Sequence, residues 1–445
     1  MGKQPVPNHQ ELEAVVAAIL DQAQRQGASA AEAGVSAEDG LSVTVRLGEV
    51  ETVEHNCDKG LGVTVYFGQR KGSASTSDYS ARAIEETVRA ACDIAKYTAA
   101  DEYAGLADAA LMAKTIPDLD LYYAWELPAE RAIELAQECE AAARAVDKRI
   151  TNSEGATVSS HSGYRVYGNS HGFVGAYPSS RHSVSCAVIA EDGHGMQRDY
   201  WYTVARDGRD LENVRKVGVR AGERTVRRLG GQRLSTRQAP VVFAPEMAAG
   251  LFSQFIRAIR GESLYRKSSF LLDSLGQAVF PAFIRIHEQP HLKKALGSAP
   301  FDSEGVATRA RDIVSAGVVQ GYVLDSYAAR KLAMQTTANA GGVHNLSIEP
   351  GGDDFAALLR RMDTGLLVTE MMGMGVNIVT GDYSRGAAGF WVERGEIQYP
   401  VEEITVAGNL REMFRRIVAV ANDVDLRSNV RTGSLLIENM TIGGT

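Results

Sequence analysis

The sequence has 445 residues, of which 44% are hydrophobic and 23% are charged. This composition is typical of globular proteins and leaves enough chain for two or three domains. The formal net charge of -8 disfavours nucleic acid as a partner. There is no run of about 18 apolar residues and no signal-peptide pattern, so we expect a cytoplasmic protein without a membrane span.

The first hundred residues predict a helix, an antiparallel meander and a second helix. Residues 10–26 place apolar side chains on one helix face, and Gly27 ends that helix. Ser77 or Asp78 can cap the second helix. Glycine-containing turns separate four short strands between the helices, at 41–47, 50–57, 61–67 and 72–76. This order indicates an α+β fold.

The rest of the N-terminal region, to residue 238, combines a helical connection with a strand-rich segment. The connection covers 101–148 and includes a helix that starts at Pro128. Strands follow over 149–207, and then a charged helix at 211–229. The polar run that begins at Gly230 marks the boundary with a C-terminal α+β domain, which we place at 239–445. Its first elements are a strand at 240–243 and a helix at 247–260.

His287-Glu288-Gln289-Pro290-His291 matches the H-E-x-x-H pattern of zinc peptidases letter for letter. That spacing forms a metal site because two histidines share one helix face. Here Pro290 would break the helix, at a cost of about 3 kcal/mol, and residues 283–286 alternate like a strand. A metal site at His287 and His291 is therefore the weaker alternative.

Two other polar segments contain candidate site residues. Residues 169–173 and 179–183 contain two histidines, several serines and an arginine, which could suggest nucleophilic catalysis. Residues 380–389 have three glycines and lack the spacing of a phosphate loop. Polar residues around glycine and proline are what turns require, so the pattern favours loops.

Arginines gather on the charged helix and the polar run after it. The residues Arg220, Arg224, Arg227 and Arg228 follow i, i+4, i+7, i+8 spacing. Such a stripe usually forms a solvated helix face, and no aromatic residue interleaves it for stacking on bases. A DNA-binding or gyrase-related regulator that uses residues 215–237 is the alternative from another functional class.

Six segments together resemble the TldD/PmbA metallopeptidase family, and its PmbA (TldE) branch in particular. The resemblance covers nearly the whole chain and rests on GNSHGFVGAYPSSRHSVSCAVIAEDG (168–193), YRKSSFLLDSLG (265–276), SAPFDSEGVATRARDIV (298–314), SYAARKLAMQTTANAGGVHNL (326–346), TGDYSRGAAGFWVERGEIQYPVEEITVAGNL (380–410) and NMTIGG near the end.

The resemblance implies an α+β N-terminal region and a C-terminal domain with a large β-sheet. It also implies a heterodimer with a TldD subunit, which contains the catalytic zinc, and a homodimer is possible. The substrates that the family implies are unfolded peptides, including microcin precursors and the antitoxin CcdA. An older family name refers to modulation of DNA gyrase.

By the same resemblance, the zinc helix of TldD corresponds to the segment before Gly261-Glu262. Its two ligand positions fall on Phe252 and Arg257, and its general-base position on Ser253. Phenylalanine has no donor atom and arginine stays protonated. The remaining ligand, a cysteine, would lie within 429–433, which has none. We therefore expect no catalytic residue and no cofactor in this chain, with zinc in its TldD partner.

In such a complex, this chain would form the wall and entrance of a peptide chamber. The two glycine- and serine-rich segments fit that role, because loops of this kind allow close approach of a ligand or partner. The residues that we expect to face the chamber or the partner are Asn169, Ser170, His171, Ser180, Arg181, His182, Asp382, Tyr383, Ser384 and Arg385.

Overall fold

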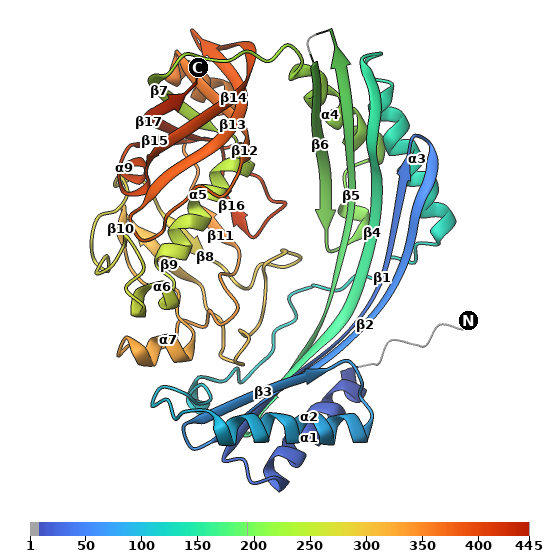
Figure 1. The fold of residues 1–445 in the computed structure, drawn as a ribbon, viewed down its shortest axis with the longest axis vertical. Coiled ribbons are helices and arrows are strands. Elements are labelled where there is room, and N and C mark those ends of the chain that lie inside the picture. The colour runs from blue at the N-terminus through green and yellow to red at the C-terminus, as the bar shows by residue number, and fades with distance from the viewer. Residues whose placement is uncertain (1–8, 194, 445) are drawn as a thin grey trace.

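The computed structural model describes residues 9–193 and 195–444. A long, curved antiparallel sheet faces a strand-rich C-terminal domain, and a group of helices lies at the foot of the sheet (Figure 1). The predicted α+β class is confirmed. No helix in the described ranges is long and apolar enough to cross a membrane.

The N-terminal sheet has six strands in the order β3-β2-β1-β4-β5-β6. All neighbours in it are antiparallel. The strands are β1 (Ala30–Arg46), β2 (Glu49–Phe67), β3 (Arg70–Thr76), β4 (Ile150–Asn169), β5 (Val174–Asp192) and β6 (Gly195–Ala205).

The predicted antiparallel meander is confirmed, but it has three strands rather than four, because two of the expected strands form one long strand and the first is longer than expected. Gly60, which suggested a turn, lies inside β2 and pairs with Ser36 of β1, and Gly62 of the next expected strand pairs with Gly34. Pairing with β1 holds both glycines extended, so the tertiary contact outweighs the preference of glycine for turns. The turns are at Gly48 and Gly68, both with positive φ.

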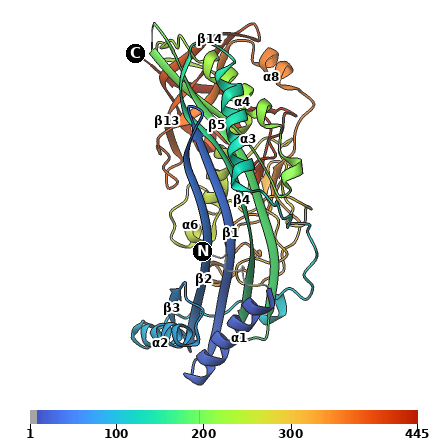
Figure 2. The same ribbon diagram turned by 90° about the vertical axis from the view of Figure 1, so that its right-hand side faces the viewer.

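Two pairs of helices cover the ends of this sheet. At one end, α1 (His9–Arg25) and α2 (Ala81–Tyr97) pack on apolar side chains of β1 and β2. The cap of α2 is Ser80, whose hydroxyl accepts the Ala83 N–H at 3.3 Å, two or three residues after the predicted cap. At the other end, α3 (Ala129–Arg144) and α4 (Val214–Arg227) lie side by side on the strands (Figure 2).

The C-terminal domain contains two sheets, in the orders β14-β13-β12-β7-β17-β15 and β10-β9-β8-β11-β16. Pairing of β14 with β17 closes the larger sheet into a barrel. The strands are β7 (Arg237–Phe243), β8 (Ile286–Glu288), β9 (Arg311–Ser315), β10 (Val318–Val319), β11 (Leu346–Ile348), β12 (Gly365–Met372), β13 (Asp382–Glu393), β14 (Glu396–Asn409), β15 (Ile417–Val420), β16 (Val430–Arg431) and β17 (Leu435–Gly443).

Five helices pack around these sheets, and the phenylalanines of α5 lie in the largest apolar core of the molecule. The Phe255 ring lies edge-on to Phe280 with 4.9 Å between ring centroids. The helices are α5 (Pro245–Ala258), α6 (Gly261–Tyr265), α7 (Ser326–Lys331), α8 (Phe355–Met362) and α9 (Leu410–Arg415).

Two glycines one turn apart let α4 approach α3 closely. A Cβ on Gly218 would lie 2.0 Å from the Cys139 carbonyl oxygen, and a Cβ on Gly222 would lie 2.6 Å from that of Ala143. Both obstacles are backbone atoms, so a methyl group there forces the helices apart. Because the glycine side of α4 packs on α3, the arginines of α4 lie on its other sides.

We therefore expect Gly218→Ala to lower the free energy of unfolding by about 1–3 kcal/mol, the usual cost of overpacking. The matched control is Gly250→Ala in α5, where a Cβ would meet nothing within 4 Å. That change should be neutral or stabilise by about 0.5–1 kcal/mol, because alanine has the better helix propensity. Urea unfolding of both variants measures the difference, and equal effects would show that the helix contact is not limiting.

Candidate functional site

The H-E-x-x-H match lies on strand β8 and the turn after it, so it does not have the helical geometry of a zinc peptidase. The His287 Nδ1 atom is 2.7 Å from Asp312 Oδ1. Glu288 is 2% exposed and accepts hydrogen bonds from Arg311 Nε at 2.9 Å and Asn339 Nδ2 at 2.7 Å. The Glu288 carboxylate therefore belongs to an internal ion pair.

The three positions that resemblance assigns to a zinc site lie on α5, and their side chains do not fit a metal. Phe252 is fully buried, with its ring centroid 6.3 Å from that of Phe280. Ser253 is exposed and donates its hydroxyl to the Ala249 carbonyl at 2.8 Å. Arg257 is also exposed and, four residues after Ser253, lies on the same side of the helix. A benzyl ring and a protonated guanidinium offer Zn²⁺ no lone pair.

The predicted loop at 169–182 is mostly strand: Asn169 ends β4, and β5 starts at Val174. Only the turn between them is irregular. Ser170 Oγ accepts the Ala31 N–H at 3.0 Å, which ties the turn to β1. Asn169 is 1% exposed and its carboxamide oxygen accepts the His171 N–H at 3.1 Å. The side chains of Ser170 and His171 are both exposed.

Ser180 and His182 are buried in β5 and bind the segment that crosses the sheet before α3. Ser180 Oγ donates to the Arg206 carbonyl at 2.6 Å and accepts the Tyr123 N–H at 2.9 Å. The two ring nitrogens of His182 contact Ser160 Oγ at 3.0 Å and the Tyr123 carbonyl oxygen at 2.9 Å. Burial lowers the pKa of His182.

Alternation along β5 places Arg181 on the exposed side, between its two buried neighbours. Ser180 and His182 therefore act in packing, and the structure does not gather the polar residues of this segment into a catalytic group.

The second predicted loop, 380–389, is also mostly strand, because β13 begins at Asp382 and pairs with both β12 and β14. Hydrogen bonds from Thr380 Oγ1 at 2.6 Å and Asn409 Nδ2 at 3.2 Å lower the pKa of Asp382. Tyr383 is buried and Ser384 exposed. Arg385 Nε donates to the Gly373 carbonyl at 3.0 Å.

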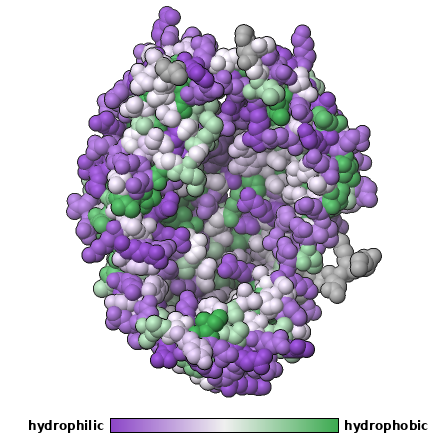
Figure 3. Space-filling model, viewed as in Figure 1, coloured by the Kyte–Doolittle hydropathy of each residue, from purple (hydrophilic) through white to green (hydrophobic). Residues whose placement is uncertain are grey.

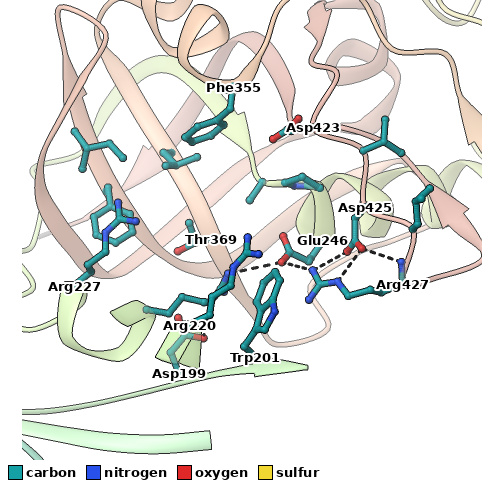
Figure 4. A pocket seen from close by; sticks show the side chains of 18 of the residues that line it. Asp199, Trp201, Arg220, Arg227, Glu246, Phe355, Thr369, Asp423, Asp425 and Arg427 are labelled. Carbon is teal, nitrogen blue, oxygen red and sulfur yellow. Dashed lines mark hydrogen bonds and ion pairs between the residues drawn. The ribbon is translucent and has the colours of Figure 1, made fainter. Parts of the chain in front are cut away.

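The arginines of α4 face a cavity between the two halves of the molecule, which sequence reasoning missed. The hollow between the N-terminal sheet and the C-terminal domain is visible in Figure 3. Within it, a cavity of about 520 Å³ is lined on one side by Asp199, Trp201, Glu212, Arg220, Arg224 and Arg227. The residues on the other side come from the C-terminal domain and include Glu246, Phe355, Phe390, Asp425 and Arg427 (Figure 4).

Most carboxylates around this cavity are paired. Arg427 donates to Asp425 Oδ1 and Glu246 Oε1, each at 2.9 Å, and its guanidinium carbon lies 3.7 Å from the Trp201 ring centroid. Arg224 Nε lies 3.4 Å from Asp199 Oδ1. The stacking of Arg427 on Trp201 links β6 to the C-terminal domain, and an ion pair of 3.7 Å between Arg224 and Glu246 links α4 to it.

The prediction that the arginine stripe of α4 forms a solvated face is thus partly wrong. Arg224 and Arg228 are 25% and 14% exposed at their side chains, and Arg228 forms an ion pair with Glu370 of β12. The i, i+4, i+7 spacing was a correct signal for one helix face, but it could not show that a wall from the C-terminal domain lies opposite.

Family models match most of the chain in three segments. The PmbA/TldA metallopeptidase domain 1 matches residues 31–95, the central domain matches 122–229, and the C-terminal domain matches 236–444. The Metalloprotease PmbA of Escherichia coli O157:H7 is 53% identical over 97% of this chain and 96% of its own length. The chain belongs to the PmbA/TldD metallopeptidase family.

Other members of the PmbA/TldD family agree with this result. A Metalloprotease PmbA homolog of Haemophilus influenzae is 52% identical over 98% of this chain and 96% of its own length. The crystal structure of a Bacteroides thetaiotaomicron protein, described as a candidate modulator of DNA gyrase, superposes with a TM-score of 0.93 at 30% identity. It covers 98% of this chain and 100% of its own. The predicted PmbA/TldD resemblance and fold are confirmed.

Proposed function

We propose that this chain is the subunit of a two-subunit PmbA/TldD peptidase that shapes the peptide chamber without supplying its zinc. A TldD-type partner would contain the metal and the general base. The observation that carries the proposal is the chemistry of α5, where Phe252 lies in the apolar core and Arg257 stays protonated. The substrates would be unfolded peptides, such as microcin precursors or the CcdA antitoxin.

Such a subunit needs a large interface, since obligate subunit contacts bury upwards of about 2,000 Å². We expect a dimer in solution, preferentially with the TldD-type partner and otherwise with a second copy. The decisive assay compares peptidase activity and zinc content for this chain alone, the TldD-type subunit alone and their mixture. Stoichiometric zinc and activity in the isolated chain would refute the proposal and favour the alternative with His287 and His291.

The alternative of a DNA-binding or gyrase-related regulator has less support from the arginine helix. Arg215 pairs with Glu138, Arg233 with Glu403, and Arg228 with Glu370. Cations that are already paired release fewer counterions on binding to phosphates. A strong salt dependence of duplex DNA binding would be the signature of this alternative.

One polar residue of each segment gives a functional test, namely His171, which is exposed, and Arg385, which is half-buried. We expect His171→Gln and Arg385→Gln each to lower peptidase activity of the mixture by roughly three- to tenfold, the effect of about 1 kcal/mol in substrate handling. Thermal stability and zinc content of the complex should stay unchanged. The control is Arg394→Gln, an exposed arginine in the turn at the far end of β13. Full activity of both variants with several peptides would show that these segments do not take part in the peptide chamber.

A further inference from the structure

We propose that the cavity beside α4 binds the C-terminal residue of a peptide that ends in an apolar side chain and a free carboxylate. This binding site rests on the proposed function for its ligand class, and it needs no zinc. It would hold a substrate or product end away from the partner's reacting metal. Two unpaired arginines, an apolar wall and the volume of the cavity support it.

Two cationic groups in the cavity lack an anionic partner. Among the described residues, neither Arg220 nor Arg227 forms a salt bridge or a hydrogen bond. The Arg220 guanidinium carbon lies 3.7 Å from the Trp201 ring centroid, and that of Arg227 lies 5.0 Å from the Phe390 centroid. Stacking uses the flat face of a guanidinium and leaves its N–H edge available for a carboxylate.

The carboxylates nearby do not neutralise these two arginines. Asp425 and Glu246 bind Arg427, and Asp423 accepts both the N–H and the hydroxyl of Ser434, at 2.8 and 2.7 Å. Burial is the largest effect on Arg220 and lowers its pKa, while exposed Glu212 at the rim acts in the opposite direction. An incoming anion would therefore gain charge-assisted hydrogen bonds that the protein itself does not make.

An apolar wall lies next to the free arginines. Phe355, Leu367, Phe390 and Ile397 line the cavity from α8, β12, β13 and β14. Leu426 lies on the same cavity and is 61% exposed, so a ligand that covered it would remove apolar surface from water. In Figure 4 Phe355 and Arg227 border the same space.

Size and charge favour a peptide end over a polyanion. A volume of about 520 Å³ is within the range of roughly 300–1,000 Å³ that small-ligand sites occupy. Four arginines and five acidic residues line the cavity. A ligand with several phosphate charges would be repelled by those acids, whereas one carboxylate matches a free guanidinium and leaves the paired groups undisturbed.

The test uses the isolated full-length chain, so it is independent of peptidase activity. Isothermal titration would measure binding of N-acetyl-Ala-Ala-Leu as the free acid and as the C-terminal amide. We expect the acid to bind at least tenfold more tightly, because a hydrogen bond to a charged group contributes roughly 1.5–3 kcal/mol. Quenching of Trp201 fluorescence should accompany binding of the acid.

Two variants locate the site. Arg227→Gln should weaken binding of the acid at least tenfold and abolish the preference over the amide. Arg215→Gln is the matched control, since Arg215 is on the same helix but is exposed and paired with Glu138 outside the cavity. It should bind as the unchanged chain does.

Equal affinity for acid and amide, no binding at millimolar peptide, unchanged affinity in Arg227→Gln, or tighter binding of ATP than of the peptide acid would each overturn this proposal. The acid–amide comparison on the unaltered chain tests recognition of the free carboxylate even if a variant folds poorly. Failure here would leave the proposed subunit role untouched, because that role is tested by zinc content and activity of the mixture.

Discussion

Replacing Glu288 with alanine should lower the free energy of unfolding by about 3–5 kcal/mol, the usual cost of removing one partner of a buried ion pair. Glu288 accepts hydrogen bonds from Arg311, Asn339 and the backbone N–H of His344. Burial lowers the pKa of Arg311, and its ion pair with Glu288 opposes that effect. Without Glu288 the Arg311 charge would remain buried and uncompensated.

The control for this experiment is Glu349→Ala. Glu349 lies 3.7 Å from Arg285 and its side chain is 59% exposed, so its loss should cost no more than about 1 kcal/mol. Chemical denaturation of both variants measures the difference. A catalytic Glu288 would behave in the opposite way, because its removal would abolish activity and leave stability nearly unchanged.

The parts of the fold that sequence predicted well are those in which the local pattern and the tertiary environment agree. The helix expected at 10–26 is α1, since its apolar face packs on the sheet that the following residues form. The helix expected at 247–260 is α5 for the same reason. At residues 10–26 the amphipathic pattern and the stop signal at Gly27 indicated one structure.

Glycine was the main source of error, because its role depends on what lies opposite. Gly389 suggested a loop, yet it lies in β13, where a Cβ would be 1.8 Å from the Leu367 carbonyl oxygen. The residue allows close approach of two strands rather than a turn. Gly60 is extended in β2 because it pairs with Ser36 of β1, although a Cβ there would meet only the Ser36 hydroxyl, at 3.8 Å. A single sequence does not distinguish these uses.

The candidate cavity could not be predicted for a different reason. Arg227 and Phe390 are far apart in the sequence, and neither belongs to a recognisable motif. The stripe on α4 identified one wall, but the opposite wall comes from α8, β12, β13 and β14. Sites formed between domains depend on long-range packing, which periodicity within one element does not encode.

A last expected result concerns pH: the contribution of Glu304 to stability should fall as the pH rises through the range of about 4.5 to 7. Glu304 is half-buried beside α7 and accepts the Ser326 N–H at 3.0 Å. Its pKa is raised from 4.5 to about 7, chiefly by burial; Asp302 and Asp325 act in the same direction, and the hydrogen bonds from Ser326 oppose them. The native state therefore keeps a proton that the unfolded chain releases.

Because the unfolded chain binds fewer protons in this range, the free energy of unfolding falls as pH increases, by up to about 3 kcal/mol from this one group. Glu304→Gln keeps an oxygen for the Ser326 N–H and removes the charge. The variant should match the unchanged chain near pH 4 and exceed its stability by up to about 3 kcal/mol at pH 8. Glu85→Gln, an exposed change on α2, should not alter the pH profile. Urea midpoints across this range provide the measurement, and parallel profiles for Glu304→Gln and the unchanged chain would show that Glu304 is already ionised in the native state at low pH.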